Sequence, residues 1–136
     1  MAIILDADVC IRGEKGAFDL KAWFASQPDE QFEIAAITVA ELWHGVERAD
    51  ATHKAPRQRY LEALLSLLPI IPYMEETALH HARIWAQVEA VGKMVGYYDL
   101  VVAATALERG STVATFNRRH FEVIPGLKVI EPGTSE

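Results

Sequence analysis

Short apolar runs that alternate with longer amphipathic stretches are the feature that most limits how this chain can fold. The apolar run Ala2–Leu5 predicts a buried strand. Further strands or extended segments are predicted at 32–37, 69–73, 111–115 and 127–130. Helical spacing of apolar residues is found at 19–26, 38–50, 60–68, 75–91 and 100–108. Strands that alternate with helices predict a three-layer α/β/α sandwich with a central, mainly parallel sheet.

Composition narrows the class of protein. The 136 residues suit one domain spanning 1–136, and 51% hydrophobic residues can build a core. The net charge of −6 argues against a stand-alone nucleic-acid binder, which usually has a strongly basic face. Cys10, the only cysteine, cannot form an internal disulfide, and the sequence shows neither a signal peptide nor a membrane-spanning run. We therefore expect a cytoplasmic protein with no membrane contact.

Asp6 stands where the chain leaves the first predicted strand, and Asp8 follows two residues later. Ligands of α/β folds bind beyond the carboxyl ends of the strands, and Thr115 ends a predicted strand in the same way. Asp6 is therefore a candidate metal ligand. The structural alternative, a turn in which the carboxylate accepts backbone N–H groups, is at least as well supported by these residues alone.

Glu41 and Asp99 each have a structural alternative as well. Thr38 and Glu41 fit a capping box, in which the glutamate reaches back to the helix N-terminus. Asp99 opens the predicted helix 100–108, whose dipole would stabilise it by about 0.3–1 kcal/mol. That helix is nearly all apolar and must be buried, so a charge at its start needs a partner. The nearest preceding cation, Lys93, is six residues away, and a bound metal ion meets the need.

Three carboxylates at element ends form a hard oxygen site, which Mg²⁺ or Mn²⁺ prefers. Zinc ligands are not indicated, because the adjacent His80 and His81 would point about 100° apart on a helix. We expect both histidines to be surface or packing residues. Gly13 and Gly16 lack the lysine of a phosphate-binding loop, and the chain has no signature of Ser-His-Asp catalysis.

Four segments, taken in order, resemble one known family over nearly the whole chain. They are 3–9 (IILDADV), 38–45 (TVAELWHG), 98–106 (YDLVVAATA) and 113–121 (VATFNRRHF). Together they are similar to the PIN-domain nucleases, and more closely to the VapC-like toxins of type II toxin–antitoxin pairs. This resemblance implies the PIN-like form of the sandwich and hydrolysis of RNA phosphodiester bonds by a Mg²⁺- or Mn²⁺-dependent endoribonuclease.

The resemblance also implies roles for particular residues. Asp6, Glu41 and Asp99 would hold one or two metal ions, with Asp8 as a secondary contact. Asn117 stands where many relatives have an aspartate. It would complete the catalytic group through its carbonyl oxygen but adds no negative charge, so the number of metal ions stays open.

Substrate and protein partners follow from the same resemblance. Thr115, Arg118 and Arg119 would contact the RNA, although exposure to solvent explains the two arginines equally well, and His120 is close enough in sequence to assist. The stretch 54–59 is a weaker candidate for substrate contact and more readily explained as an exposed connection between helices. VapC-like toxins pair as homodimers and bind an antitoxin segment along a groove of the early helices. The aromatic residues of those helices are Trp23, Phe24, Trp43 and Tyr60.

Two alternatives to a nuclease remain open from the sequence. A degenerate PIN domain could act only as a protein-interaction module. The presence of Asn117 in place of an acid supports this alternative. A phosphatase with an aspartyl nucleophile at Asp6 is less well supported, because such enzymes usually need a lysine near a later strand end, whereas Thr115 is followed by Asn117 and Arg118. The RNA target and the cleavage site are not indicated.

Overall fold

Five parallel strands form one sheet in the computed structural model, which describes residues 2–133. The strands are β1 (Ala2–Leu5), β2 (Gln31–Ala35), β3 (Ile70–Ile71), β4 (Thr112–Ala114) and β5 (Lys128–Ile130). Their order across the sheet is β3-β2-β1-β4-β5, so β1 lies at the centre between β2 and β4. The expected α/β fold is confirmed, and every strand pair in the described part is parallel.

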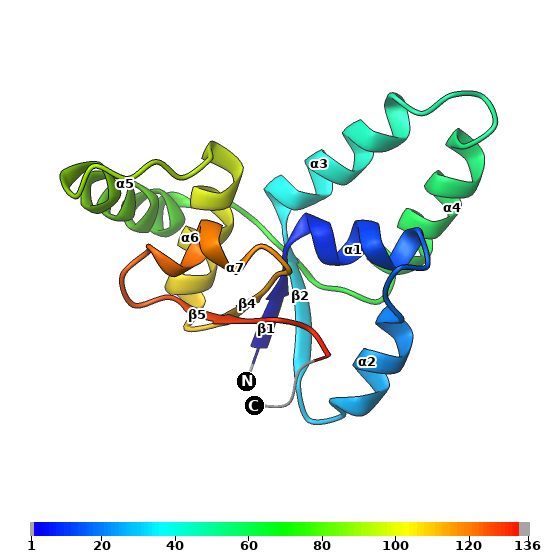
Figure 1. Cartoon of the computed structure of the whole chain (residues 1–136), viewed down its shortest axis with the longest axis horizontal. Coiled ribbons are helices and arrows are strands. Elements are labelled where there is room, and N and C mark those ends of the chain that lie inside the picture. The colour runs from blue at the N-terminus through cyan, green and yellow to red at the C-terminus, as the bar shows by residue number, and fades with distance from the viewer. Residues whose placement is uncertain (1, 134–136) are drawn as a thin grey trace.

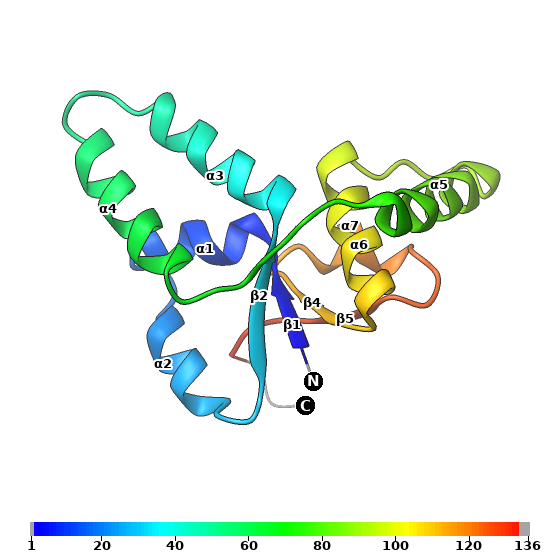
Figure 2. The ribbon, with the colours of Figure 1, turned by 180° about the vertical axis from the view of Figure 1, so that it is seen from behind.

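Helices cover both faces of this sheet (Figures 1 and 2). They are α1 (Ala7–Glu14), α2 (Leu20–Ser26), α3 (Ala36–Glu47), α4 (Lys54–Leu65), α5 (Glu75–Ala90), α6 (Tyr97–Arg109) and α7 (Arg118–Glu122). In both views α5, α6 and α7 lie on one side of the strands, and α1, α2 and α4 lie on the other. Among the described residues, no helix is long and apolar enough to cross a membrane.

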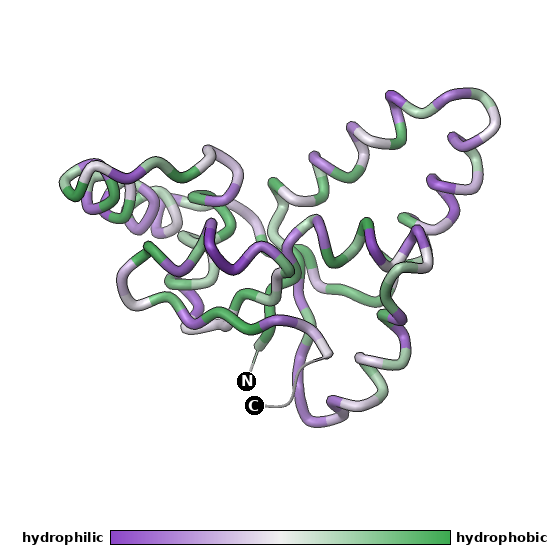
Figure 3. The backbone as a smooth tube through the Cα atoms, viewed as in Figure 1, coloured by the Kyte–Doolittle hydropathy of each residue, from purple (hydrophilic) through white to green (hydrophobic). Residues whose placement is uncertain are grey.

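The two faces of β1 belong to two different cores. Ile4 packs with buried residues of α5, α6 and α7, whereas Ile3 and Leu5 pack with residues of α1, α2 and α4. Successive side chains of a strand point to opposite faces, which explains this division. The apolar character of β1 and of α6 is visible along the backbone in Figure 3. Burial of each such aliphatic side chain stabilises the fold by about 1.5–3 kcal/mol.

Helix α6 supplies much of one core, as its apolar sequence predicts. Residues 100–106 are all buried, and the helix stops at Gly110, whose φ of 65° suits glycine. The predicted start is wrong by two residues, because the helix begins at Tyr97 rather than at Asp99. Asp99 consequently lies inside the first turn of the helix.

Two predictions about the middle helices are wrong. Helix α3 begins at Ala36, so Thr38 lies within the helix, buried, and no capping box forms with Glu41. The hydroxyl of Thr38 has no hydrogen-bond partner among the described residues. The polar stretch 54–59, expected to be an exposed connection, is the first half of α4. Loss of the capping box matters for function, because it removes the structural role that competed for Glu41.

Candidate functional site

Asp6 lies at the carboxyl end of β1, where its side chain is only 7% exposed. It is the N-cap of α1: its Oδ1 accepts a hydrogen bond of 2.8 Å from the backbone N–H of Ala7. Its Oδ2 accepts a 2.8 Å hydrogen bond from the hydroxyl of Thr115. The turn-like contact that the sequence suggested is therefore present, but it engages only one of the two carboxylate oxygens.

Thr115 links Asp6 to Asp8 and fixes both at the end of β4. Its Oγ1 is 3.4 Å from each carboxylate oxygen of Asp8 and accepts a 3.0 Å hydrogen bond from the N–H of Asn117. The N–H of Phe116 donates to Oδ2 of Asp8 at 3.0 Å. A hydroxyl has one hydrogen to donate, so its shorter contact with Asp6 is the main one.

The remaining two acids come from different helices. Glu41 projects from α3 and is half-buried, and Asp99 projects from the first turn of α6. Oδ2 of Asp99 lies 3.3 Å from Nδ1 of His120 in α7. Charge interactions link Asp6 with Asp8 and Asp99, and Glu41 with Asp6 and Asp99, so acids that are widely separated in sequence lie near one another. Their role as metal ligands stays a prediction.

The pKa values of these acids reflect their crowding. Burial raises the pKa of Asp6 to about 7, with further contributions from the charges of Asp8 and Asp99. Burial raises the pKa of Glu41 to about 7 as well, reinforced by the charges of Asp6 and Asp99. For Asp8 and Asp99 burial also raises the pKa, opposed at Asp8 mainly by the N–H of Phe116 and at Asp99 by His120. The four carboxylates therefore repel one another in a partly dry site.

Cations do little to relieve this repulsion. Within residues 2–133, no lysine or arginine forms an ion pair with Asp6, Glu41 or Asp99, and the exposed His120 is the one basic side chain in contact with Asp99. The nearby thiol of Cys10 is buried, which raises its pKa to about 12. Buried acids without cationic partners are costly to a fold, which makes such a cluster a functional candidate.

The cluster suits a hydrated divalent cation by its donor chemistry. Among the described residues, no three histidine, cysteine, aspartate or glutamate side chains are arranged closely enough to enclose a metal ion by themselves. Mg²⁺ does not need such a cage, because it keeps several water ligands and is held by one or two carboxylates together with substrate phosphates. The all-oxygen donor set and the uncompensated negative charge therefore fit Mg²⁺ or Mn²⁺.

A hollow of about 430 Å³ lies along the segment 116–120. Asn117, Arg118, Arg119 and His120 line it. Arg118 shares its charge with Glu122 at 3.7 Å, in an exposed pair that costs little to exchange for another anion. His120, which contacts Asp99, also lines this hollow, so the hollow reaches one of the predicted acids.

One contributor to the site was missed from the sequence. Arg12 lies on α1, one turn after Asp8, where its charge lowers the pKa of that acid, and its guanidinium stacks 4.2 Å from the ring centre of Phe116. The signal was the spacing of four residues between Asp8 and Arg12, which brings side chains together on a helix. No helix was predicted over the residues of α1, so this spacing was not used.

The alternative of an aspartyl nucleophile at Asp6 finds no support here. The segment after β4 carries Thr115 and Asn117, and within the described residues no lysine forms an ion pair with Asp6.

Comparison with known proteins agrees with this arrangement. The sequence profile of the PIN domain matches residues 3–127. A ribonuclease VapC of Rickettsia bellii is 30% identical over 131 residues, which cover 96% of each chain. A tRNA(fMet)-specific endonuclease VapC of Salmonella typhimurium is 35% identical over 96 residues, 71% of each chain.

Solved structures give the same result. The DNA-bound VapBC of Salmonella typhimurium contains a chain that superposes with a TM-score of 0.88 at 30% identity, covering 96% of this chain and 98% of that one. Sequence and fold agree, and we conclude that this chain belongs to the PIN-domain family, among its VapC ribonucleases.

Proposed function

We propose that the chain is a Mg²⁺- or Mn²⁺-dependent endoribonuclease and the toxin of a type II toxin–antitoxin pair. The observation that carries this proposal is the cluster of Asp6, Asp8, Glu41 and Asp99, in which each acid is partly or fully buried and its pKa is raised. The relatives named ribonuclease VapC support the activity. A cytoplasmic location and one domain over 1–136 stay predictions.

In this proposal Asp6, Glu41 and Asp99 hold the metal, and Thr115 fixes the orientation of Asp6. A bound divalent ion supplies Lewis acidity, which activates water and offsets the charge that develops on the phosphate. Glu41 is half-buried and has no capping role, so its carboxylate is free to orient the attacking water. Asn117 offers a carbonyl oxygen without charge, so the proposal does not fix whether one or two metal ions bind.

Substrate phosphates are held by the hollow along 116–120 in this proposal. Arg118 and Arg119 supply positive charge in a protein whose net charge is −6. Such phosphate contacts position a nucleic acid without reading its sequence. His120 lies between these arginines and Asp99, where it can donate a hydrogen bond to either the acid or a phosphate oxygen.

The test combines metal binding with RNA cleavage. Wild-type protein and Asp99→Asn are titrated with MnCl₂ by calorimetry and incubated with a labelled RNA, and Glu47→Gln serves as an exposed acid-to-amide control. We expect wild type and Glu47→Gln to bind Mn²⁺ and cleave, and Asp99→Asn to cleave at least about 100-fold more slowly. Full cleavage by Asp99→Asn, or wild-type cleavage in EDTA, would contradict the proposed site. Absence of both Mn²⁺ binding and cleavage in wild type would favour the degenerate interaction module.

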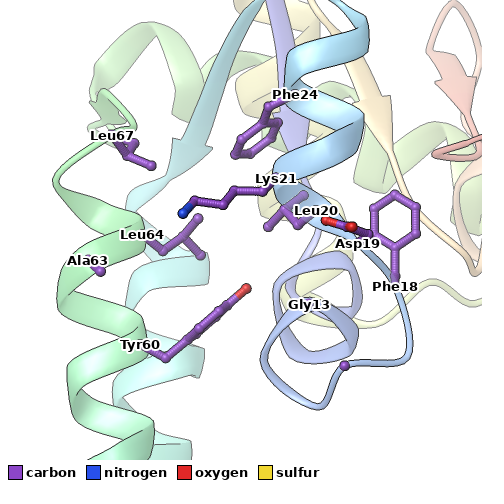
Figure 4. Close-up of a pocket in the computed structure, with 11 residues that line it drawn as sticks. Gly13, Phe18, Asp19, Leu20, Lys21, Phe24, Tyr60, Ala63, Leu64 and Leu67 are labelled. Carbon is purple, nitrogen blue, oxygen red and sulfur yellow. The ribbon is translucent and has the colours of Figure 1, made fainter.

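The proposed antitoxin partner has a suitable surface between α2 and α4. A groove of about 530 Å³ is lined by Leu20, Phe24, Tyr60 and Leu67 (Figure 4), so two of the four early aromatic residues face it. Lys21 reaches across this groove toward α4 and can pair with an acid of the bound segment. The solved VapBC complexes are assemblies of such relatives with antitoxins.

Co-expression with the neighbouring small open reading frame tests the partner. We expect relief of toxicity and recovery of a complex in a pull-down, and loss of that complex in Leu67→Asp, whose side chain is 64% exposed and therefore tolerates the change. The RNA target can be found by mapping RNA 5′ ends after brief induction of wild type and Asp99→Ala. A proposed homodimer is checked by the mass of the purified toxin in solution.

A further inference from the structure

The guanidinium of Arg12 lies over the ring of Phe116, with its Cζ 4.2 Å from the ring centre. Arg12 belongs to the last turn of α1, whereas Phe116 follows β4. A guanidinium on the face of an aromatic ring is held there by a cation–π attraction. The stack therefore gives the long side chain of Arg12 a defined position.

The ring beneath Arg12 is itself fixed. Phe18 meets the ring of Phe116 edge-on, with ring centres 5.2 Å apart and planes at 74°, and Phe18 also contacts the buried Trp23 at 6.0 Å. The backbone N–H of Phe116 donates a 3.0 Å hydrogen bond to Oδ2 of Asp8. Arg12 thus stacks on a ring that is anchored both in the core and at the acid cluster.

The N–H groups of Arg12 are not used within the described part of the chain. The side chain is exposed, and over residues 2–133 it forms neither a hydrogen bond nor an ion pair with another residue. Arg57, Arg109 and Arg118, in contrast, each pair with a glutamate. Stacking occupies the face of a guanidinium, while its donors point outward from the edges in a fork that matches a phosphate.

A hollow with other cations lies on the far side of this contact. Phe116 lines the hollow along 116–120 together with Arg118 and Arg119. Arg12 therefore brings a cation from α1 to a hollow whose other arginines belong to α7. In a chain with a net charge of −6, affinity for a polyanion has to come from such local groups of cations.

The charge of Arg12 acts on Asp8 rather than on the helical acids of the proposed metal site. It lowers the pKa of Asp8, whereas the charges that shift the pKa values of Glu41 and Asp99 are those of other residues. A phosphate bound by Arg12 is thus separate from the phosphate that a metal ion at those acids would hold.

We infer that Arg12 binds an RNA phosphate that flanks the scissile one, with the ring of Phe116 holding the guanidinium in the orientation that this contact needs. The inference rests on the proposed ribonuclease function. It adds a substrate-binding residue on α1, to which the resemblance of the sequence gave no role.

The first test measures RNA binding without cleavage. Fluorescence anisotropy of a fluorescein-labelled RNA of mixed sequence in EDTA gives the Kd of wild type, Arg12→Gln and Arg12→Lys. Arg12→Gln should bind roughly 10-fold more weakly and lower the slope of log Kd against log salt by about 1. Arg12→Lys keeps the charge but loses the planar fork, so the slope should stay as in wild type while Kd rises about threefold. Arg83→Gln, at an exposed arginine of α5, is the matched control and should bind as wild type does.

A double-variant cycle tests the role of the ring. Phe116→Leu should weaken RNA binding because the guanidinium loses its support, whereas Phe116→Tyr keeps the ring and should stay within about twofold of wild type. In Arg12→Gln/Phe116→Leu the two effects should overlap, so that Kd stays within about twofold of that of Arg12→Gln alone. Fully additive effects would show that the ring does not orient Arg12 and would contradict the inference.

Kinetics separate a substrate contact from an effect through Asp8. At saturating Mn²⁺, Arg12→Gln should raise KM roughly 10-fold and leave kcat within about twofold of wild type. A lower kcat or weaker Mn²⁺ binding in calorimetry, with an unchanged Kd for RNA, would mean that Arg12 acts by positioning Asp8 and would overturn the substrate contact.

Two further outcomes contradict the inference. One is an equal Kd and salt slope for wild type and Arg12→Gln while wild type still cleaves, which leaves the ribonuclease proposal intact. The other is unchanged RNA affinity of Arg12→Gln together with loss of the co-expressed partner in a pull-down, which assigns Arg12 to the partner protein. Failure of wild type to cleave any RNA would instead contradict the proposed function, so the two failures are distinguishable.

Discussion

The molecule buries carboxylates in two places, and only one of the two forms an ion pair with a cation. Glu33 on β2 is 3% exposed and forms a two-point ion pair with Arg109 of α6, at 3.1 Å and 2.6 Å. Asp6, one strand away and 7% exposed, accepts hydrogen bonds but forms no ion pair with a lysine or arginine of the described residues. The charge of Glu33 is compensated within the fold, whereas the charge of Asp6 is met only by hydrogen bonds from Ala7 and Thr115.

Glu33 and the acids of the site also differ in where they lie in the fold. Glu33 lies mid-strand, and its hydrogen-bonded partner stands at the last residue of α6. Asp6, Asp8 and Asp99 lie where a strand ends or a helix begins, which is where an α/β fold presents its ligands, whereas Glu41 lies midway along α3. A search for function in this fold should therefore rank buried acids by whether a cation compensates them, not by burial itself.

The largest expected effect comes from removing the charge of Asp6. Asp6→Asn should lower RNA cleavage at least about 100-fold. It should also raise the Tm of the metal-free protein by about 3 °C, because a repelling buried charge is gone. Cleavage assays and thermal melts in EDTA check the two effects. A lower Tm together with lost activity would mean that Asp6 is a structural residue.

Removing Arg109, which pairs with Glu33, should lower stability and leave RNA cleavage nearly unchanged, the opposite of the result expected for Asp6→Asn. Arg109→Met leaves Glu33 buried and alone, and we expect a loss of about 3 kcal/mol in the free energy of unfolding, or about 10 °C in Tm. Cleavage at a permissive temperature should change little. The double variant Glu33→Gln/Arg109→Met should recover most of the loss in denaturant melts, and failure to recover would show that the arginine stabilises by packing.

Thr115 tests how far the site depends on orientation. Thr115→Val keeps the shape but removes the hydroxyl that Asp6 accepts from, and cleavage should fall about 10-fold. Thr115→Ser restores the hydroxyl and should remain within about twofold of wild type. Initial rates at saturating Mn²⁺ measure this, and equal rates for valine and serine would remove Thr115 from the mechanism.

An exposed acid completes the series with the smallest effect. Glu47 pairs with Lys54 at 3.8 Å, and both side chains are largely open to solvent. Glu47→Gln should change the free energy of unfolding by less than about 0.5 kcal/mol and leave cleavage unchanged. Denaturant titration checks this, and a loss above 1 kcal/mol, roughly twice the expected limit, would show that the α3–α4 pair matters more than its exposure implies.

The local pattern of the sequence predicts the sheet and most of the helices. Asp6 and Asp99 stand beside strongly apolar segments, so their place at element ends is visible from neighbouring residues alone. The role of Glu41 was harder to predict from the sequence, because Thr38 three residues earlier suggested a capping box. Periodicity does not fix where a helix starts, and the actual start at Ala36 carried Thr38 into the interior.

Contacts between distant residues could not be predicted in this way. Thr115 and Asp6 are 109 positions apart, and Arg109 and Glu33 are 76 apart. The periodicity of a helix or a strand does not predict such pairs, since they depend on how β1, β2 and β4 align in the sheet. The same limit applies to the stacking of Arg12 on Phe116, which lie far apart in the sequence.

The buried thiol described beside the acids has a practical consequence. Cys10 is the sole cysteine, is 1% exposed and has a pKa of about 12, so thiol reagents cannot label it while α1 is docked. The rate at which Cys10 is alkylated therefore measures how often the segment that carries Asp6 and Asp8 opens locally. The protein thus contains its own chemical reporter, with which the effect of metal or partner binding on the opening of that segment can be timed without any engineered probe.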